Sequence, residues 1–237
     1  MSAFGQQILD FLRSLITWLP GLALGVILHE YAHGLIAYRM GDPTAKNYGR
    51  LTLNPKAHID LFGSILLPLL LLLLNSGIVF GYAKPVPINP GYFKNYRKGM
   101  RYTSLAGPVA NLILAFAAGL IYGIFFYLVI RISGGVMDDG SIGSNTFIIF
   151  NQLFVNTIYI NIFLAIFNFM PIPPLDGSKI LASFLPDNAM HRFLSFGRYG
   201  FFFIFIFIFL MGRSFFTIIS PVFSFLYNLC TWWQYLL

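Results

Sequence analysis

Five long apolar stretches run through the 237-residue chain, and they limit what it can fold into more than any other feature. Each is long enough for a helix across a bilayer, which takes about 20 residues. Lipid offers no partners to backbone polar groups, so a spanning chain forms helices or a closed barrel, and a barrel would show short segments of alternating polarity. The sequence therefore predicts an all-α polytopic membrane protein with about four to six transmembrane helices. The stretches cover residues 12–38, 61–80, 102–130, 147–170 and 199–237.

The composition excludes the other large classes of protein. Only 10% of the residues are charged, whereas a soluble domain carries about 25%. Intrinsic disorder and nucleic-acid binding also need a polar, charged chain, so both are excluded for the same reason. We expect membrane lipids around the protein and no nucleic-acid partner. No shift in composition marks an appended soluble domain, which predicts a single membrane domain over residues 1–237.

The distribution of basic residues predicts how the stretches are oriented. The loops 39–60 and 81–101 carry four and five Lys or Arg residues, a density typical of cytoplasmic loops. Both loops lie on the cytoplasmic side only if residues 61–80 do not cross the bilayer completely, and Pro68 interrupts that stretch. We therefore predict that residues 61–80 are re-entrant, with a full crossing as the alternative. The next two stretches then lead outward and return.

Two short segments next to this stretch, residues 50–59 and 83–89, are expected to be extended. Prolines in or beside them exclude helix. We predict that they form a small membrane-associated β element, which pairs internally or adds a strand from a binding partner. The prolines are Pro55, Pro85, Pro87 and Pro90.

The first apolar stretch contains an HExxH motif, His29-Glu30-Tyr31-Ala32-His33. Histidines four residues apart share one face of a helix, so both imidazoles can reach one zinc ion. Glu30 can take a proton from a water molecule that the metal activates. Three ionisable groups within one turn of an apolar helix are costly, which favours a functional site over a polar cluster that only packs helices.

A hydrolytic zinc site needs a third protein ligand and leaves a fourth position for water. Asp176 is the strongest candidate, because three prolines break the helix before it and Gly177 permits a tight turn. By helical rise, His29 lies roughly 15 Å from the cytoplasmic end of its stretch, and Asp176 follows a stretch that ends on the same side. The other candidates are His58, Asp60, Asp187 and His191.

Four other polar residues have competing interpretations. Asn111 lies ten residues after Arg101, at an estimated depth similar to that of the histidine pair, and Asn168 precedes the proline break. Both asparagines either contact a substrate or form hydrogen bonds between helices. His58 and Asp60 either support the site from a second layer, contact the substrate or respond to pH, or they cap and brace their loop.

Taken together, these motifs resemble the site-2 protease family of intramembrane zinc metalloproteases. The resemblance is carried by the HExxH motif in a first span, by residues 107–111 (GPVAN) and by residues 168–177 (NFMPIPPLDG). Residues 50–60 and 81–87 resemble one compact prokaryotic branch of the family, which we expect to have neither a PDZ nor a CBS domain. The similar region extends over about residues 26–182.

This resemblance implies a division of roles among the candidate residues. One zinc ion per chain would be bound by His29, His33 and Asp176, and Glu30 would serve as general base and acid. The substrate backbone would be held or polarised by two asparagines, Asn111 and Asn168. The β element would lie near the cleft.

We therefore expect an intramembrane zinc metalloendopeptidase of the kind that carries out regulated intramembrane proteolysis. It would hydrolyse peptide bonds within or near transmembrane segments of membrane-protein substrates. Its catalytic core would cover about residues 12–185, followed by the Phe-rich transmembrane region 199–237. The active site would face the cytoplasm from a prokaryotic plasma membrane, and the sequence leaves open whether the chain forms a homo-oligomer.

Two alternatives belong to other functional classes. A catalytically silent scaffold or chaperone of protease ancestry would be expected to have lost a ligand or the base, whereas this chain keeps all four residues. A membrane metal-ion carrier would need ligands through both leaflets, whereas the candidates here cluster at one estimated depth.

Overall fold

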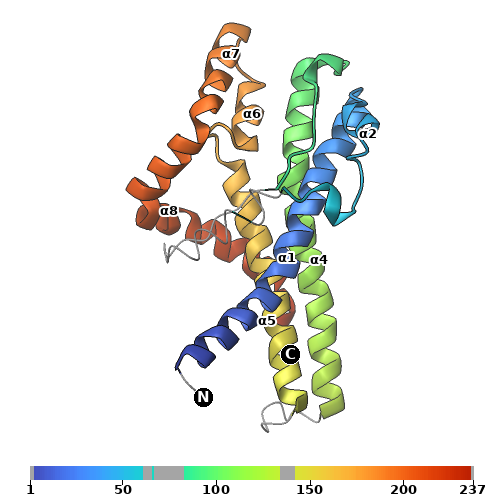
Figure 1. Cartoon of the computed structure of the whole chain (residues 1–237), viewed down its shortest axis with the longest axis vertical. Coiled ribbons are helices and arrows are strands. Elements are labelled where there is room, and N and C mark those ends of the chain that lie inside the picture. Colours follow the sequence, from blue (N-terminus) through green and yellow to red (C-terminus); the bar gives the residue numbers. More distant parts are fainter. Residues whose placement is uncertain (1–2, 61–65, 67–82, 134–141, 236–237) are drawn as a thin grey trace. The chain divides into compact units, whose positions relative to one another are not determined.

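The computed structural model describes residues 3–60, 66, 83–133 and 142–235 (Figure 1). Helices account for its regular structure. The α-helices are α1 (Ala3–Met40), α2 (Thr44–Asn47), α4 (Tyr96–Ser133), α5 (Ile142–Phe169), α6 (Asp176–Ala182), α7 (Asp187–Ser195) and α8 (Gly200–Cys230). Short 3-10 turns cover Pro55–Ala57, Pro90–Tyr92, Phe196–Tyr199 and Trp232–Tyr235.

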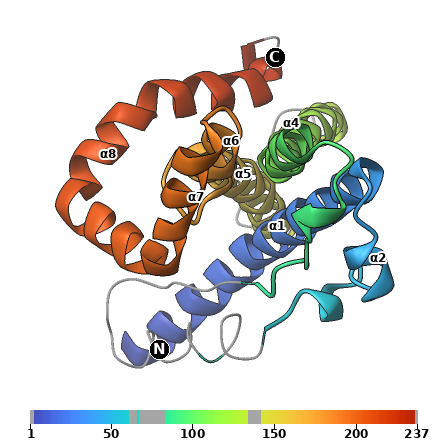
Figure 2. The same ribbon diagram turned by 90° about the horizontal axis from the view of Figure 1, so that it is seen from above.

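Three of the described helices are long and apolar enough to cross a membrane: Leu12–Met40, Tyr96–Ile132 and Thr146–Phe169. This agrees with an all-α membrane protein. The predicted number of four to six spans is not confirmed by the described residues. Thr217–Cys230 at the end of α8 is apolar but shorter, and α8 follows a wide arc (Figure 2). The predicted re-entrant stretch 61–80 lies, apart from Leu66, outside the described residues.

The predicted β element is not confirmed, because no strand is assigned among the residues that the structure describes. The first segment turns instead of extending: Asn54 accepts a hydrogen bond from the Lys56 amide and caps the 3-10 turn Pro55–Ala57. One backbone hydrogen bond does join the two segments, from the Lys84 amide to the His58 carbonyl at 2.9 Å. Prolines in the second segment lack the N–H groups that would continue such a ladder.

The chain divides into two compact units. The first unit comprises Met1–Gly25, Pro108–Met170 and Tyr199–Leu237. The second comprises Val26–Gly107 and Pro171–Arg198. The expectation of a single domain is not tested by this division.

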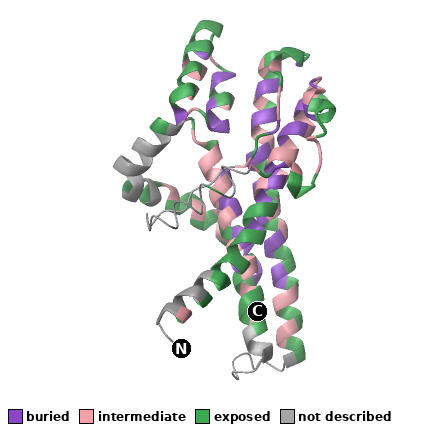
Figure 3. Ribbon diagram, in the orientation of Figure 1, coloured by how far each residue is buried: buried purple, intermediate pink, exposed green. Residues whose placement is uncertain are grey.

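The first unit is held together by aromatic and aliphatic side chains from α4, α5 and the C-terminal end of the chain. Tyr122 stacks on Phe154 and meets Trp233 edge to face, with ring centroids 5.5 and 4.9 Å apart. The C-terminal segment approaches α4 at a glycine: a Cβ on Gly119 would lie 2.0 Å from the Cys230 carbonyl oxygen. Many other apolar positions of α4 and α5 are exposed, as expected of a surface that lipid covers (Figure 3).

In the second unit, buried Asp42, just after α1, joins the start of α2 to the loop that precedes α4. Its Oδ1 accepts hydrogen bonds from the amide and the hydroxyl of Thr44, at the start of α2. Its Oδ2 accepts from the Asn89 amide at 2.7 Å. Gly41 has a φ of +113°, a conformation that favours glycine. The loop that returns to α4 is thereby fixed against the end of α1.

The second unit also ties the turn between α6 and α7 to the start of α4. Arg97 donates hydrogen bonds to the Leu185 carbonyl at 2.6 Å and to Asp187 Oδ1 at 2.7 Å. Arg101 donates to Ser183 Oγ and covers the ring of Phe184 at 3.8 Å. The contacts with residues 183–185 hold α6, whose first residue is Asp176, in a set position within this unit, whereas the exposed Arg97–Asp187 ion pair contributes little.

Candidate metal centre

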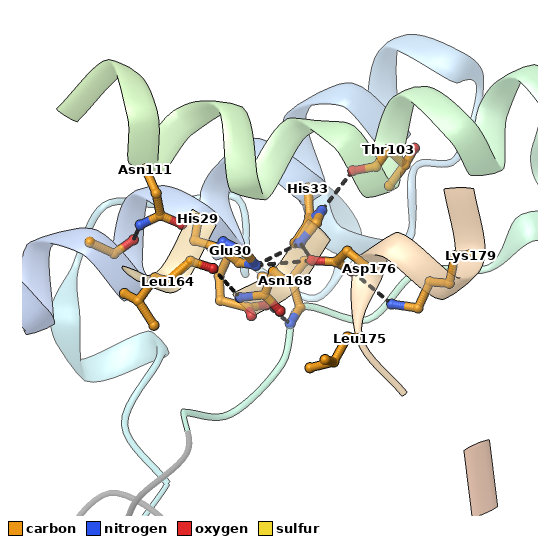
Figure 4. A network of polar contacts seen from close by, with 12 residues as sticks. His29, Glu30, His33, Thr103, Asn111, Leu164, Asn168, Leu175, Asp176 and Lys179 are labelled. Carbon is orange, nitrogen blue, oxygen red and sulfur yellow. Dashed lines mark hydrogen bonds and ion pairs between the residues drawn. The ribbon is translucent and has the colours of Figure 1, made fainter. Parts of the chain in front are cut away.

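Two histidines from α1 and one aspartate from α6 converge in the second unit (Figure 4). Their candidate ligand atoms all lie within 4.8 Å of one another. His29 and His33 Nε2 are 2.9 Å apart, and they lie 3.2 and 3.0 Å from Asp176 Oδ2. All three residues are buried. The structure thus brings together the three residues proposed from the sequence as zinc ligands.

The surroundings of Asp176 leave one of its oxygens for the histidines. Lys179, one turn later on α6, donates to the other oxygen, Oδ1, at 3.0 Å. Burial alone would raise the pKa of the Asp176 carboxyl, but its contacts with His29 and His33 and the charge of Lys179 hold this pKa well below its ordinary value. The carboxyl group is therefore ionised, which is the form that binds a metal.

His33 is held from both ends of its ring. Its Nδ1 lies 2.6 Å from the carbonyl oxygen of Thr103 on α4. This oxygen can only accept, so Nδ1 carries the proton in this contact. Nε2 is then the nitrogen directed at Asp176 and His29. A backbone carbonyl in this role is a common second-layer partner of metal-binding histidines, because it selects the tautomer and orients the ring.

The donor set and its spacing fit a zinc ion. Two imidazole nitrogens and one carboxylate oxygen form a ligand set used by hydrolytic zinc sites, with a fourth position for water or substrate. Ligand atoms of a tetrahedral zinc site are about 3.3 Å apart when the bonds are about 2.0–2.1 Å. The observed separations of 2.9–3.2 Å are close to that value. Within the described part of the chain, no other group of His, Cys, Asp or Glu residues gathers in this way.

Glu30, beside the first histidine, is oriented by the segment that follows the undescribed stretch. Its Oε2 accepts a hydrogen bond from the Val86 amide at 2.8 Å. Val86 stands between Pro85 and Pro87, which have no N–H, so it is the one amide donor of that tripeptide. Its side chain is buried, and a Cβ on Gly34 would lie 3.1 Å from it. The sequence indicated an extended segment here but not this contact with the base.

The predicted asparagines are both in the first unit. Asn111 is fully buried, and its Nδ2 donates to the Gly25 carbonyl at 3.1 Å and to Asn161 Oδ1 at 2.8 Å. Asn161 in turn donates to the Gly21 carbonyl at 3.2 Å. Half-buried Asn168 donates to the carbonyl of its own helix at Leu164. The Asn111 contacts correspond to the helix-packing interpretation, and a role of either asparagine in substrate binding stays a prediction.

The remaining candidates do not join the metal cluster. His58 is buried, with Nε2 2.8 Å from the Thr52 carbonyl, and braces its own loop. Asp60 is partly buried and likewise lies outside the cluster. Asp187 is exposed and paired with Arg97, and His191 is exposed on α7. A second-layer role for His58 or Asp60 stays a prediction.

Sequence reasoning missed three contacts that orient the site. Thr103 contacts His33, Val86 contacts Glu30 and Lys179 contacts Asp176. Two of them use backbone groups, which leave no side-chain pattern in the sequence. The single amide between two prolines at Val86 was a usable signal, because it marks the one donor that the segment can direct at α1. The spacing of Asp176 and Lys179, three residues apart on one helix, was another.

Comparison with known proteins agrees with this site. Residues 17–212 match the family model described as Peptidase family M50. The chain is 38% identical over 195 residues to the Bacillus subtilis protein "Putative zinc metalloprotease YwhC", covering 81% of each chain. It is 26% identical over 222 residues to "Putative zinc metalloprotease Rip2" of Mycolicibacterium smegmatis, covering 92% of this chain and 76% of that one. No solved structure matches the chain. The family match over most of the sequence, together with the similarity to the Bacillus protein, places the chain in Peptidase family M50, the site-2 protease family.

Proposed function

We propose that the protein is a zinc metalloendopeptidase that hydrolyses peptide bonds within or near transmembrane segments of other membrane proteins. The observation that carries the proposal is that Asp176 meets His29 and His33 next to Glu30. The two histidines and Glu30 lie in a helix that is apolar enough to cross a membrane. The names of the two relatives above support the metal and the class of reaction. A position on the cytoplasmic side of the bilayer is supported by the basic loops next to the site's helices.

In this mechanism the two histidines and Asp176 would hold the metal. When bound, zinc supplies Lewis-acid chemistry that polarises the scissile carbonyl and acidifies water. Glu30 accepts a proton from the attacking water as the water oxygen bonds to the carbonyl carbon of the substrate. Glu30 then returns the proton to the amide nitrogen as the C–N bond breaks, so that one water molecule is consumed. The Val86 amide, bonded to Glu30 Oε2, orients the carboxylate for both transfers.

A substrate helix must unwind before this reaction, because its carbonyl groups are engaged in its own hydrogen bonds. The segment around Val86 forms no helix and lies beside the base through its contact with Glu30. It is the natural place for an unwound strand to be held by its main chain. Asn111 and Asn168 are proposed to contact the substrate, which for Asn111 requires its present hydrogen bonds to open.

The test is proteolysis by purified protein in lipid vesicles that also contain a panel of labelled single-span helices. We expect cleavage by the wild-type chain, loss of cleavage with a zinc chelator, and no cleavage by Glu30→Gln although this variant keeps its zinc. General base catalysis contributes about 10²–10⁴-fold, so the loss should be at least of that order. Asp187→Asn, which changes an exposed acid outside the cluster, is the matched control and should cleave normally.

Two outcomes would contradict the proposal. A zinc-loaded Glu30→Gln protein with full activity would refute the role of Glu30 as base. A wild-type chain that binds zinc but cleaves none of the panel, while altering the stability of one of its members, would favour a scaffold or chaperone.

A further inference from the structure

Gly107 brings α4 against the metal cluster with no side chain in between. A Cβ built on Gly107 would lie 2.5 Å from His33 Nε2 and 2.6 Å from both Nε2 and Cε1 of His29. These are the two nitrogens that meet Asp176 Oδ2. Ordinary van der Waals contacts of a Cβ begin at 3.4 Å. A side chain of any size at position 107 therefore overlaps both candidate zinc-binding nitrogens.

We propose that Gly107 is a positioning residue of the metal centre: the absence of its side chain allows His29 and His33 to direct their nitrogens at one ion. The inference rests on the proposed function, because it assumes that these nitrogens bind zinc. To regain 3.4 Å from an alanine Cβ, the nitrogens would have to retreat by about 0.8 Å. Ligand distances in metal sites hold to within about 0.2 Å. The displacement is several times that tolerance.

The same helix prevents His33 from moving away freely. Thr103 lies four residues before Gly107 on α4, and so on the same face. Its carbonyl oxygen holds His33 Nδ1 at 2.6 Å. A shift of α4 that relieved the overlap at Gly107 would pull this carbonyl away from the ring. A tilt of the ring that relieved it would redirect Nε2. In both cases the metal-binding geometry changes.

Gly99 provides a matched comparison on the same helix and in the same unit. A Cβ on Gly99 would lie 2.4 Å from Cγ of Phe93, an overlap as severe as the one at Gly107 but with an apolar ring. Inside a helix, alanine is favoured over glycine by about 1 kcal/mol. Any loss of stability in either Gly→Ala variant therefore comes from the overlap and not from helix propensity.

The experiment measures zinc affinity of Gly107→Ala, Gly99→Ala and wild-type protein by competition with a fluorescent zinc chelator in detergent. We expect Gly107→Ala to bind zinc at least 10- to 100-fold more weakly, the range seen when second-layer partners of metal sites are lost. Gly99→Ala should unfold at a lower temperature but bind zinc with wild-type affinity. Wild-type affinity in folded Gly107→Ala would overturn the inference alone. A folded wild-type chain that binds no zinc would overturn the proposed function and the inference with it.

A second measurement decides the matter if Gly107→Ala does not fold alone. In a His29→Ala/His33→Ala background, the three nearest atoms that an alanine at position 107 would meet are gone. The substitution at 107 should then be tolerated, with a folded yield at least that of the background, because residues in contact show non-additive effects. An equal loss of folded protein with and without the imidazoles would refute the contact on which the inference depends.

Discussion

Removal of Asp176 is the most direct test of the three-ligand site. Structural zinc sites with four protein ligands bind with apparent free energies of about 10–16 kcal/mol, or roughly 2.5–4 kcal/mol for each ligand. Each 1.4 kcal/mol is a tenfold change in affinity. Asp176→Ala should therefore weaken zinc binding by about two to three orders of magnitude. No replacement is at hand, because within the described residues only His29, His33 and Asp176 form a group that could hold a metal.

The assay is titration of purified protein with zinc against a chelator of known affinity. Asp187→Ala is the matched control, because it also removes one carboxylate from the second unit but lies outside the cluster. Its zinc affinity should equal that of the wild type. A thermal melt with and without zinc gives an independent readout: zinc should raise the unfolding temperature of the wild type and the control, and much less that of Asp176→Ala.

One result would refute the reasoning. If folded Asp176→Ala bound zinc with wild-type affinity, the third ligand would have to come from elsewhere. His58 would be examined first, although its ring now lies against the Thr52 carbonyl. A ligand among the residues that the structure does not describe would be the other source.

Two further predictions concern packing and orientation. Gly25→Ala should lower the free energy of unfolding by about 1–3 kcal/mol through overpacking, because its Cβ would lie 2.3 Å from Asn161 Oδ1. Thermal melts measure this loss. Gly197→Ala is the control and should be neutral, because its Cβ would lie 3.9 Å from the nearest atom. For orientation, Lys98→Cys in a Cys230→Ser background should react with a membrane-impermeant thiol reagent in inverted vesicles and not in intact cells. Labelling in intact cells would place the basic loop outside and contradict the proposed position of the site on the cytoplasmic side.

The sequence predicted the parts of the metal centre that depend on local geometry. His29 and His33 must share a helix face at a spacing of four, and this holds for any helix. Asp176 is distant in sequence, and its selection rested on the proline break before it and on the family resemblance. The contact of Gly107 with both imidazoles could not be predicted, because it depends on how closely α4 approaches α1 in the second unit.

The β element shows where reasoning from residue type was insufficient. Prolines excluded α-helix in residues 50–59, which was correct, but they do not by themselves produce a strand. Asn54 caps a 3-10 turn at Pro55–Ala57, and this local side-chain hydrogen bond competes with pairing. The second segment uses the Val86 amide for Glu30 and the Asn89 amide for Asp42. These two amides therefore bond to α1 and to the turn after it, and the Lys84 amide alone is seen to bond to the first segment.

The GPVAN motif contains two residues under different constraints. Gly107 belongs to the second unit and is required to be small by the imidazoles that it faces. Asn111, one helical turn later, belongs to the first unit and is required to donate hydrogen bonds to the Gly25 carbonyl and Asn161. A short motif in this helix therefore combines a steric condition for metal binding with a polar condition for helix packing. Because the two conditions are physically independent, substitutions at position 107 should change zinc affinity, and those at position 111 should change the stability of the first unit.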